Sequence, residues 1–348
     1  MFMKAAADRA LLLTCILSVL ALGCACSREK AADASVSRTD SPAARSAQTL
    51  VQTSFPADDA PLPSINGNRA FQYTKEVAAF GPRPIGSANH KKLEEYIPAH
   101  LKGDEVEDDS FTADTPEGKL PVHNIIAKFP GSKDGIIVIA GHYDTPYYLR
   151  NTGFVGANDG GSSTGMLLEL ANHFRGKKQD GYSVWLLFTD GEEAVKEWTD
   201  TDSVYGTRHI SEKWQKDGTL KKIKAFILQD MIGDADLGID RDQNSTPWLE
   251  DVVYQAATRY GYQSHFFQLN NSDLDDHIPF AQKGVPVADL IDLDYGYNRS
   301  FWHKPEDTID KVSAKSLQMV GDVILETVRM LDNMPAVPPP TAPAQKSR

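Results

Sequence analysis

Five short apolar segments, rich in β-branched residues, constrain the fold of this 348-residue chain more than any other feature of its sequence. Each is nearly continuous in apolar character, which is typical of strands covered on both faces. Segments with helical periodicity lie between or after them, at 163–174, 248–260 and 315–333. This alternation predicts an α/β fold: a three-layer α/β/α sandwich with a central mixed, mostly parallel sheet. The strand-like segments are 124–129, 135–143, 183–190, 224–232 and 285–291.

The N-terminus has the form of a secretory signal. Lys4 and Arg9 precede an apolar stretch at 10–22, and a small residue, Gly23, comes before Cys24. The apolar stretch is short for a membrane span. A cysteine directly after a small residue resembles a bacterial lipoprotein signal, in which Cys24 would carry the lipid; simple secretion with cleavage nearby is the alternative. We therefore expect a signal peptide at 1–24 and an exported protein, either periplasmic or anchored in the outer membrane, or else secreted.

One folded domain is expected, at 65–333. Residues 25–64 are rich in Ala, Ser, Thr, Asp and Pro with few large apolar residues, so this segment reads as a disordered linker. The proline-rich tail at 334–348 is also expected to be unstructured. The formal charge of −12 argues against a nucleic-acid partner. All three cysteines lie within the first 26 residues, so the predicted domain contains no disulfide and no cysteine metal ligand.

Polar side chains follow the predicted strands where each of them ends, and in a mostly parallel sheet these ends gather at one edge. Taken singly, each has an ordinary explanation: Asp159, within Asn-Asp-Gly-Gly, suits a turn, and Glu192 and Glu193 suit a solvated strand end. Together, oxygen and imidazole ligands without cysteine predict a catalytic zinc site, with three protein ligands and one open position. The residues are His142, Asp159, Glu192, Glu193, Asp230 and His303.

Residues 68–333 resemble the zinc aminopeptidase-like (M28-type) fold, which includes secreted aminopeptidases and glutaminyl cyclases. Within that group the finer similarity is to glutaminyl-peptide cyclotransferases. The glutamate pair is shared with the aminopeptidases, whereas the spacing to Trp198 and the runs at 202–209 and 275–280 are not. The stretches that carry the resemblance are 80–87, 154–159, 190–198, 202–209, 275–280 and 301–303.

The resemblance implies that the chain converts the N-terminal glutamine of peptides and proteins to pyroglutamate with release of ammonia, with N-terminal glutamate as a further candidate substrate. The expected reaction is a zinc-assisted intramolecular aminolysis with one zinc ion per chain. The implied zinc ligands are Asp159, Glu193 and His303. The other implied residues are Glu192 as general acid/base, Asp230 and Asp275 as its acidic neighbours, and Trp198 and Trp302 around the glutamine side chain.

The chemistry explains why two adjacent glutamates would divide their roles. The α-amine must lose a proton as it attacks the γ-amide carbon, and the leaving NH₂ must gain one, so one carboxylate near both can perform each step in turn. Glu193, as a metal ligand, would stay ionised, while Glu192 would be free to move protons. Neighbouring carboxylates would raise its proton affinity.

Two other functions compete with this interpretation. In a two-zinc aminopeptidase, His142 and Asp230 would hold a second zinc, Asp159 would bridge the two ions, and Glu192 would activate a water molecule. A non-enzymatic binding module on the same fold would be expected to have lost ligands, and none is missing here. No nucleic-acid partner is expected, and contact with a membrane is expected only through a lipid on the N-terminus.

Several residues keep a structural alternative or depart from the family pattern. Either tryptophan can be a packing residue, and we expect Asp275 or its neighbour Asp276 to cap the following helix. Asp289 stands where animal cyclases carry a histidine of the active-site network. The loop at 292–300 is expected to give the pocket an aromatic wall through Tyr295 or Tyr297. The sequence does not predict the oligomeric state or the physiological substrates.

Overall fold

The computed structural model describes residues 60–335. The predicted signal peptide at 1–24 lies outside the described residues, as do the predicted linker up to residue 59 and the tail from residue 336 onward. These three assignments therefore stay predictions.

A six-stranded sheet forms the centre, in the order β1-β2-β4-β3-β5-β8. The neighbours β4, β3, β5 and β8 pair in parallel, whereas β1–β2 and β2–β4 are antiparallel, which confirms a mixed, mostly parallel sheet. Strands β6 and β7 form a separate parallel pair. The strands are β1 Glu105–Thr115, β2 Gly118–Phe129, β3 Gly131–His142, β4 Gln179–Thr189, β5 Ile223–Asp230, β6 Ile239–Asp242, β7 Phe266–Asn271 and β8 Val287–Ile291.

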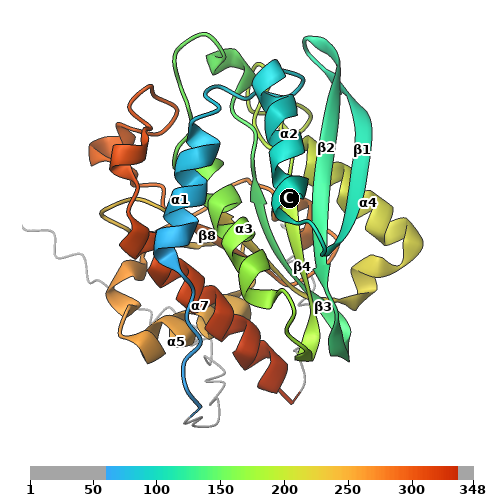
Figure 1. The fold of residues 1–348 in the computed structure, drawn as a ribbon, viewed down its shortest axis with the longest axis vertical. Coiled ribbons are helices and arrows are strands. Elements are labelled where there is room, and N and C mark those ends of the chain that lie inside the picture. The colour runs from blue at the N-terminus through green and yellow to red at the C-terminus, as the bar shows by residue number, and fades with distance from the viewer. Residues whose placement is uncertain (1–59, 336–348) are drawn as a thin grey trace, which may run out of the picture. The chain divides into compact units, whose positions relative to one another are not determined.

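Both faces of the sheet are covered, which is why its central strands are continuously apolar. On β3, Ile137 and Ile139 pack into one hydrophobic core while Val138 and Ala140 pack into the other, as alternate strand positions do. Helices α1, α3 and α7 lie side by side across the first face (Figure 1), and α4 and α6 pack on the second through residues such as Trp214. The predicted three-layer sandwich is confirmed. The helices are α1 Gly67–Ala78, α2 Ala88–His100, α3 Gly161–Phe174, α4 Tyr205–Asp217, α5 Pro247–Tyr260, α6 Ile278–Ala281 and α7 Ala314–Asn333.

Local signals set several helix starts. The side chain of Ser313 accepts hydrogen bonds from the backbone of the first turn of α7, and α5 begins at Pro247, whose fixed φ suits the first helical position. No helix within residues 60–335 has the length and apolar character needed to cross a membrane. Strands β3, β4, β5 and β8 all end at the same edge of the sheet, and that edge carries the candidate site.

Candidate active site

A cavity with a volume of about 510 Å³ opens at this edge. All eight residues to which the resemblance assigned roles in the expected reaction line it, so the structure brings together side chains separated by more than a hundred positions in the chain. Their individual roles stay predictions. The eight are Asp159, Glu192, Glu193, Trp198, Asp230, Asp275, Trp302 and His303. His142, the further candidate from the strand ends, is not among the described residues of the lining.

Asp159, Glu193 and His303 converge as a set of metal ligands would. Nε2 of His303 lies 3.3 Å from Oδ2 of Asp159 and 3.2 Å from Oε1 of Glu193. Both carboxylates are buried, yet Oδ2 of Asp159 and both side-chain oxygens of Glu193 have no hydrogen-bond partner. Burial raises the pKa of Glu193 to about 7, with His303 opposing the shift. Buried ligand atoms left without partners suit a bound cation, and a donor set of two carboxylates and one imidazole suits zinc.

Tyr148 is a site residue that the sequence analysis missed. Its hydroxyl lies 2.6 Å from Nδ1 of His303, the ring nitrogen that points away from the carboxylates. With Nε2 directed at the metal position, Nδ1–H donates to the tyrosine oxygen and fixes the orientation of the imidazole. Tyr148 lies in a short 3₁₀ turn, Tyr147–Leu149, where no sequence pattern marks it.

The loop that carries Asp159 is held from two sides. Arg83 is fully buried, and its guanidinium donates to the carbonyl oxygens of Tyr143 (2.7 Å), Gly156 (2.8 Å) and Asp159 (3.2 Å), and to that of Val155. On the other side, the carboxylate of Asp307 accepts from the backbone N–H groups of Asn158 and Asp159 and from the hydroxyl of Tyr295. This backbone position is therefore fixed before any ligand binds.

Asp144 holds the turn that presents the two glutamates. Its carboxylate accepts from the backbone N–H of Glu192 at 3.2 Å and from that of Glu193 at 3.3 Å. The carbonyl of Glu192 accepts in turn from the N–H of Val204. Burial raises the pKa of the Glu192 side chain well above its ordinary value, and the negative charge of Asp275 raises it further. Glu192 thus has the high proton affinity expected of a general acid/base.

Asp275 and Asp276 have different surroundings. Burial, and then the charge of Asp230, raise the pKa of Asp275 well above its ordinary value. Asp276 is fully buried and accepts from the hydroxyls of Thr189 (2.5 Å) and Thr207 (2.6 Å). The prediction that one of them caps the next helix is wrong, because α6 has no side-chain cap. Asp276 instead ties the end of β4 to α4.

Asp289, which stands where animal cyclases carry a histidine, lies beside a buried histidine of the 275–280 run. Asp289 is fully buried, and its Oδ2 lies 3.5 Å from Nδ1 of His277, whose Nε2 lies 3.2 Å from Asp242. Burial, and then the charge of Asp275, raise the pKa of Asp289 well above its ordinary value. The acid at this position is therefore accommodated by a buried imidazole next to it.

His142 lies between two carboxylates at the base of the cavity. Its Nε2 is 3.1 Å from Oδ1 of Asp230 and 3.2 Å from Oδ1 of Asp159. These three residues form a second group whose ligand atoms lie close enough to hold a metal ion. The geometry therefore accommodates the two-metal arrangement as well as the one-metal arrangement.

The aromatic wall of the cavity differs from the prediction. Trp302 lies beside His303, with ring centroids 4.5 Å apart, and Trp198 is 39% exposed at the mouth. Neither tyrosine of the 292–300 loop is among the described residues that line the cavity. Tyr295 is fully buried, and its hydroxyl donates a hydrogen bond to Asp307. Tyr297 is 87% exposed and lines a different cavity.

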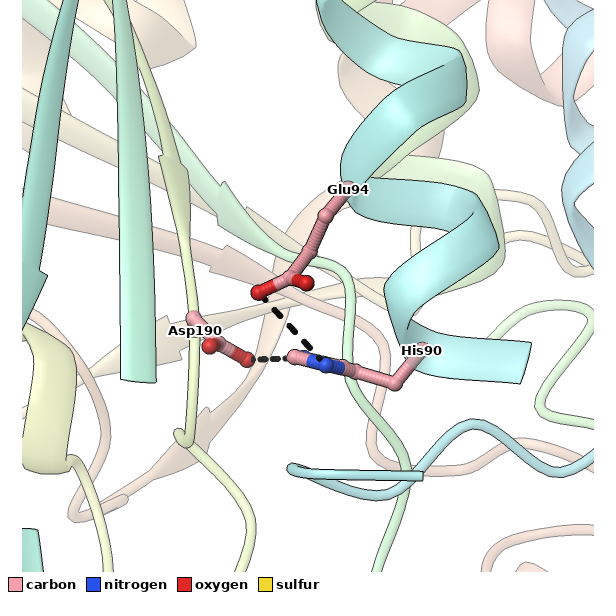
Figure 2. Close-up of side chains that lie close together, drawn as sticks. All are labelled: His90, Glu94 and Asp190. Carbon is pink, nitrogen blue, oxygen red and sulfur yellow. Dashed lines mark hydrogen bonds and ion pairs between the residues drawn. The ribbon is translucent and has the colours of Figure 1, made fainter. Parts of the chain in front are cut away.

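A buried ion pair lies beneath the glutamate turn. Figure 2 shows His90 and Glu94 on α2 pointing toward Asp190, which directly follows β4. Nε2 of His90 is 2.6 Å from Oδ1 of Asp190, and its Nδ1 is 3.7 Å from Glu94. Oδ2 of Asp190 accepts from the N–H of His123. Burial alone would lower the pKa of His90, but the carboxylate of Asp190 outweighs it and raises the pKa.

Replacing His90 with phenylalanine is expected to lower the free energy of unfolding by about 3 kcal/mol, because it leaves Asp190 buried without its partner. The raised pKa of His90 sets the sign of the pH dependence. Its stabilisation is complete below its unfolded pKa of about 6.5 and is lost as the pH rises through the folded value. Urea unfolding at about pH 6 and about pH 9 measures both effects.

Glu94→Gln is the matched control, since Glu94 lies farther from the imidazole, and it is expected to cost less than about 1 kcal/mol. Equal stability of wild type and His90→Phe at the lower pH would contradict a stabilising pair.

Comparison with known proteins places the chain in a family. Residues 124–328 match the sequence profile of peptidase family M28. The chain belongs to this family. Among its relatives, a glutaminyl-peptide cyclotransferase of Drosophila melanogaster is 33% identical over 271 residues, covering 69% of this chain and 75% of that protein.

Solved structures resemble this M28 chain over nearly their full length. A glutaminyl cyclase of an Acidobacteriales bacterium is 50% identical with a TM-score of 0.77, covering 79% of this chain and 98% of that one. A Zn-dependent exopeptidase from Parabacteroides distasonis is 26% identical with a TM-score of 0.69, covering 79% of this chain and 100% of that one. The predicted family and fold are thus confirmed, and both cyclases and an exopeptidase share the fold.

Proposed function

We propose that this chain is a glutaminyl-peptide cyclotransferase that converts the N-terminal glutamine of peptides and proteins to pyroglutamate. One observation carries the proposal. The cavity joins a cluster suited to metal, a buried glutamate outside that cluster and two tryptophans, in a chain 50% identical to a bacterial glutaminyl cyclase. That cyclase is 50% identical to this chain, whereas the exopeptidase is 26% identical.

The side chains of the cavity divide the work of the reaction. Glu192 accepts a proton from the α-amine as the amine attacks the γ-amide carbon, and then gives it to the leaving NH₂. Asp275 keeps a proton close to Glu192, because burial and the mutual repulsion of the two carboxylates raise the pKa of both, and the charge of Asp230 raises that of Asp275 further. Trp198 and Trp302 hold the glutamine side chain folded back on its own amine, which supplies the proximity that the ring closure requires.

Asp159, Glu193 and His303 would hold a zinc ion, which when bound polarises the γ-carbonyl oxygen and stabilises negative charge on it. Tyr148 would keep the imidazole of His303 in orientation, and Arg83 and Asp307 would keep the Asp159 loop in place.

The proposal is tested by incubating the purified chain with a peptide that begins with glutamine. Cyclisation releases ammonia and lowers the peptide mass by one ammonia, both of which are measured directly. A peptide beginning with leucine and an aminoacyl amide are run beside it. Strong hydrolysis of the leucine peptide and the aminoacyl amide, with no cyclisation of the glutamine peptide, would contradict the proposal.

The second candidate is a two-zinc aminopeptidase, favoured by the convergence of His142, Asp159 and Asp230. In that enzyme Glu192 would take a proton from a water molecule instead of from an amine. The number of metal ions needed for activity distinguishes the two.

Removing the metal with a chelator is expected to abolish cyclisation and to lower the melting temperature, because Asp159 and Glu193 lose the charge that compensates them. Adding back one equivalent of zinc is expected to restore both, with elemental analysis reporting one ion per chain. A requirement for two equivalents, together with hydrolytic activity, would favour the aminopeptidase.

We further propose that the protein is exported and anchored through Cys24, which is supported only by the form of its N-terminus. A Cys24→Ser variant would then appear in the soluble fraction while the wild type stays with the membranes. Identical fractionation of both would count against lipidation.

A further inference from the structure

A second cavity, with a volume of about 810 Å³, shares a wall with the catalytic one. At the end of β8 and in the turn that follows it, Ile291 and Leu293 line the catalytic cavity, while Asp292 and Asp294 line the second. The same short segment therefore contributes side chains to both cavities. The second cavity, termed the acidic cavity, contains six aspartates: Asp234, Asp236, Asp240, Asp292, Asp294 and Asp310.

Positive charge is scarce among the residues that line the acidic cavity. Lys311 is the only lysine or arginine of the described lining, and its ammonium pairs with Asp310. His265 is engaged through Nδ1 with the carbonyl of Leu237. The other five aspartates therefore face the cavity without a matching cation from its lining.

Asp240, on β6, is the clearest case. The residue is only 6% exposed and lines the cavity, and no described residue forms a hydrogen bond or a salt bridge with its carboxylate. Burial, and then the charge of Asp294, raise its pKa to about 6, while the positive charge of Arg299 opposes this shift. A cation placed in the cavity would give this carboxylate a direct ion-pair partner.

The chemistry of the cavity favours an organic cation over a metal ion. Among the described residues, several sets of three His, Asp or Glu side chains lie close enough together to hold a metal ion. None of these sets includes a residue of the acidic cavity. Tyr297, which is 87% exposed, and Phe301 add aromatic surface to the lining. Carboxylates next to aromatic rings suit a guanidinium or ammonium group on a flexible stem.

We propose that the acidic cavity binds an arginine or lysine side chain of the peptide substrate while its N-terminal glutamine occupies the catalytic cavity. This rests on the proposed function, and it assigns a substrate class: peptides with a basic residue a short distance after the glutamine. The two cavities share the segment at 291–294. An extended chain advances about 3.3 Å per residue, so one particular spacing between the glutamine and the basic residue should fit best.

The experiment uses peptides Gln-(Ala)n-Arg-Ala with n varied from one to six, each paired with the same peptide carrying citrulline, the uncharged analogue of arginine. We expect the ratio of kcat/KM for arginine over citrulline to peak at one spacing at about tenfold, through KM and not kcat. Asp240→Asn is expected to bring this ratio close to one while leaving kcat/KM for the citrulline peptide unchanged. Asp294→Asn, at the exposed rim, is a second variant should the buried substitution impair folding.

Glu117→Gln is the matched control, because it removes the same charge at an exposed position in the turn between β1 and β2. A ratio that is flat with spacing, or that falls as much in Glu117→Gln as in Asp240→Asn, would assign the preference to the net charge of −12 and overturn the proposal. Absence of cyclisation for every peptide would refute the proposed function instead. Calorimetric binding of the arginine and citrulline peptides then still reports on the acidic cavity.

Discussion

Replacing Glu192 with glutamine is expected to lower kcat for cyclisation by about a thousandfold, the range that a positioned general acid/base contributes. Glutamine has the same shape, and the ion pair between the Glu192 carboxylate and Nδ1 of His142 is long, at 3.7 Å, so the fold should tolerate the change. KM and zinc content should change little. The measurement is ammonia release together with metal analysis.

The adjacent Glu193→Gln variant is the matched control. It removes the same charge one residue along the same turn, but from the metal cluster, so zinc should be lost together with activity. The pH profile separates the two further. In the wild type, activity should increase with pH as the buried Glu192 loses its proton. Because the pKa of Glu192 is raised, this increase should occur at higher pH than for an ordinary glutamate. The residual activity of Glu192→Gln should not show this increase.

Full activity of Glu192→Gln would remove Glu192 from the mechanism. A loss of zinc from Glu192→Gln equal to that from Glu193→Gln would instead place Glu192 among the ligands. Either outcome would overturn the division of labour between the two glutamates.

The central strands could be predicted because burial on both faces leaves an unmistakable apolar run. Segment 135–143 became β3 with only small changes at its ends. The edge strand β1 was missed, because Glu105–Thr115 carries acidic and polar residues in alternation with few apolar ones. Helix α2 was missed for a similar reason: it is short of apolar residues and contains Pro98. Elements that are only partly buried, such as β1, resemble loops in composition.

The residues of the site also divide into those that the sequence could indicate and those that it could not. Asp159, Glu193 and His303 follow strands or carry a recognisable motif, so position in the fold and resemblance both pointed to them. Tyr148 and Asp144 act on those residues through loop contacts, and no spacing in the sequence signals such contacts. The misplaced tyrosines of the 292–300 loop show the limit of composition. An aromatic residue near a site can also donate a hydrogen bond to a buried carboxylate, as the hydroxyl of Tyr295 does to Asp307.

Among the residues that support the site, Arg83 is expected to contribute most to the free energy of unfolding. Arg83→Leu is expected to lower the free energy of unfolding by about 4 kcal/mol, because it leaves four carbonyl oxygens of two loops buried without donors. Burial lowers the pKa of its guanidinium to about 10, which still leaves it charged at neutral pH among the carboxylates of Asp159 and Asp307. Chemical unfolding measures the loss.

Arg83→Lys distinguishes the geometry of the donors from the charge. Lysine keeps the positive charge but cannot aim a planar fork of donors at four carbonyls, so it should recover only part of the stability and of the zinc affinity. Both readouts should fall together, since the backbone that Arg83 holds is the backbone that carries Asp159. If Arg83→Lys matched the wild type in both, the charge alone would suffice. If Arg83→Leu lost stability but bound zinc as tightly as the wild type, the Asp159 loop would be organised by Asp307 and not by Arg83.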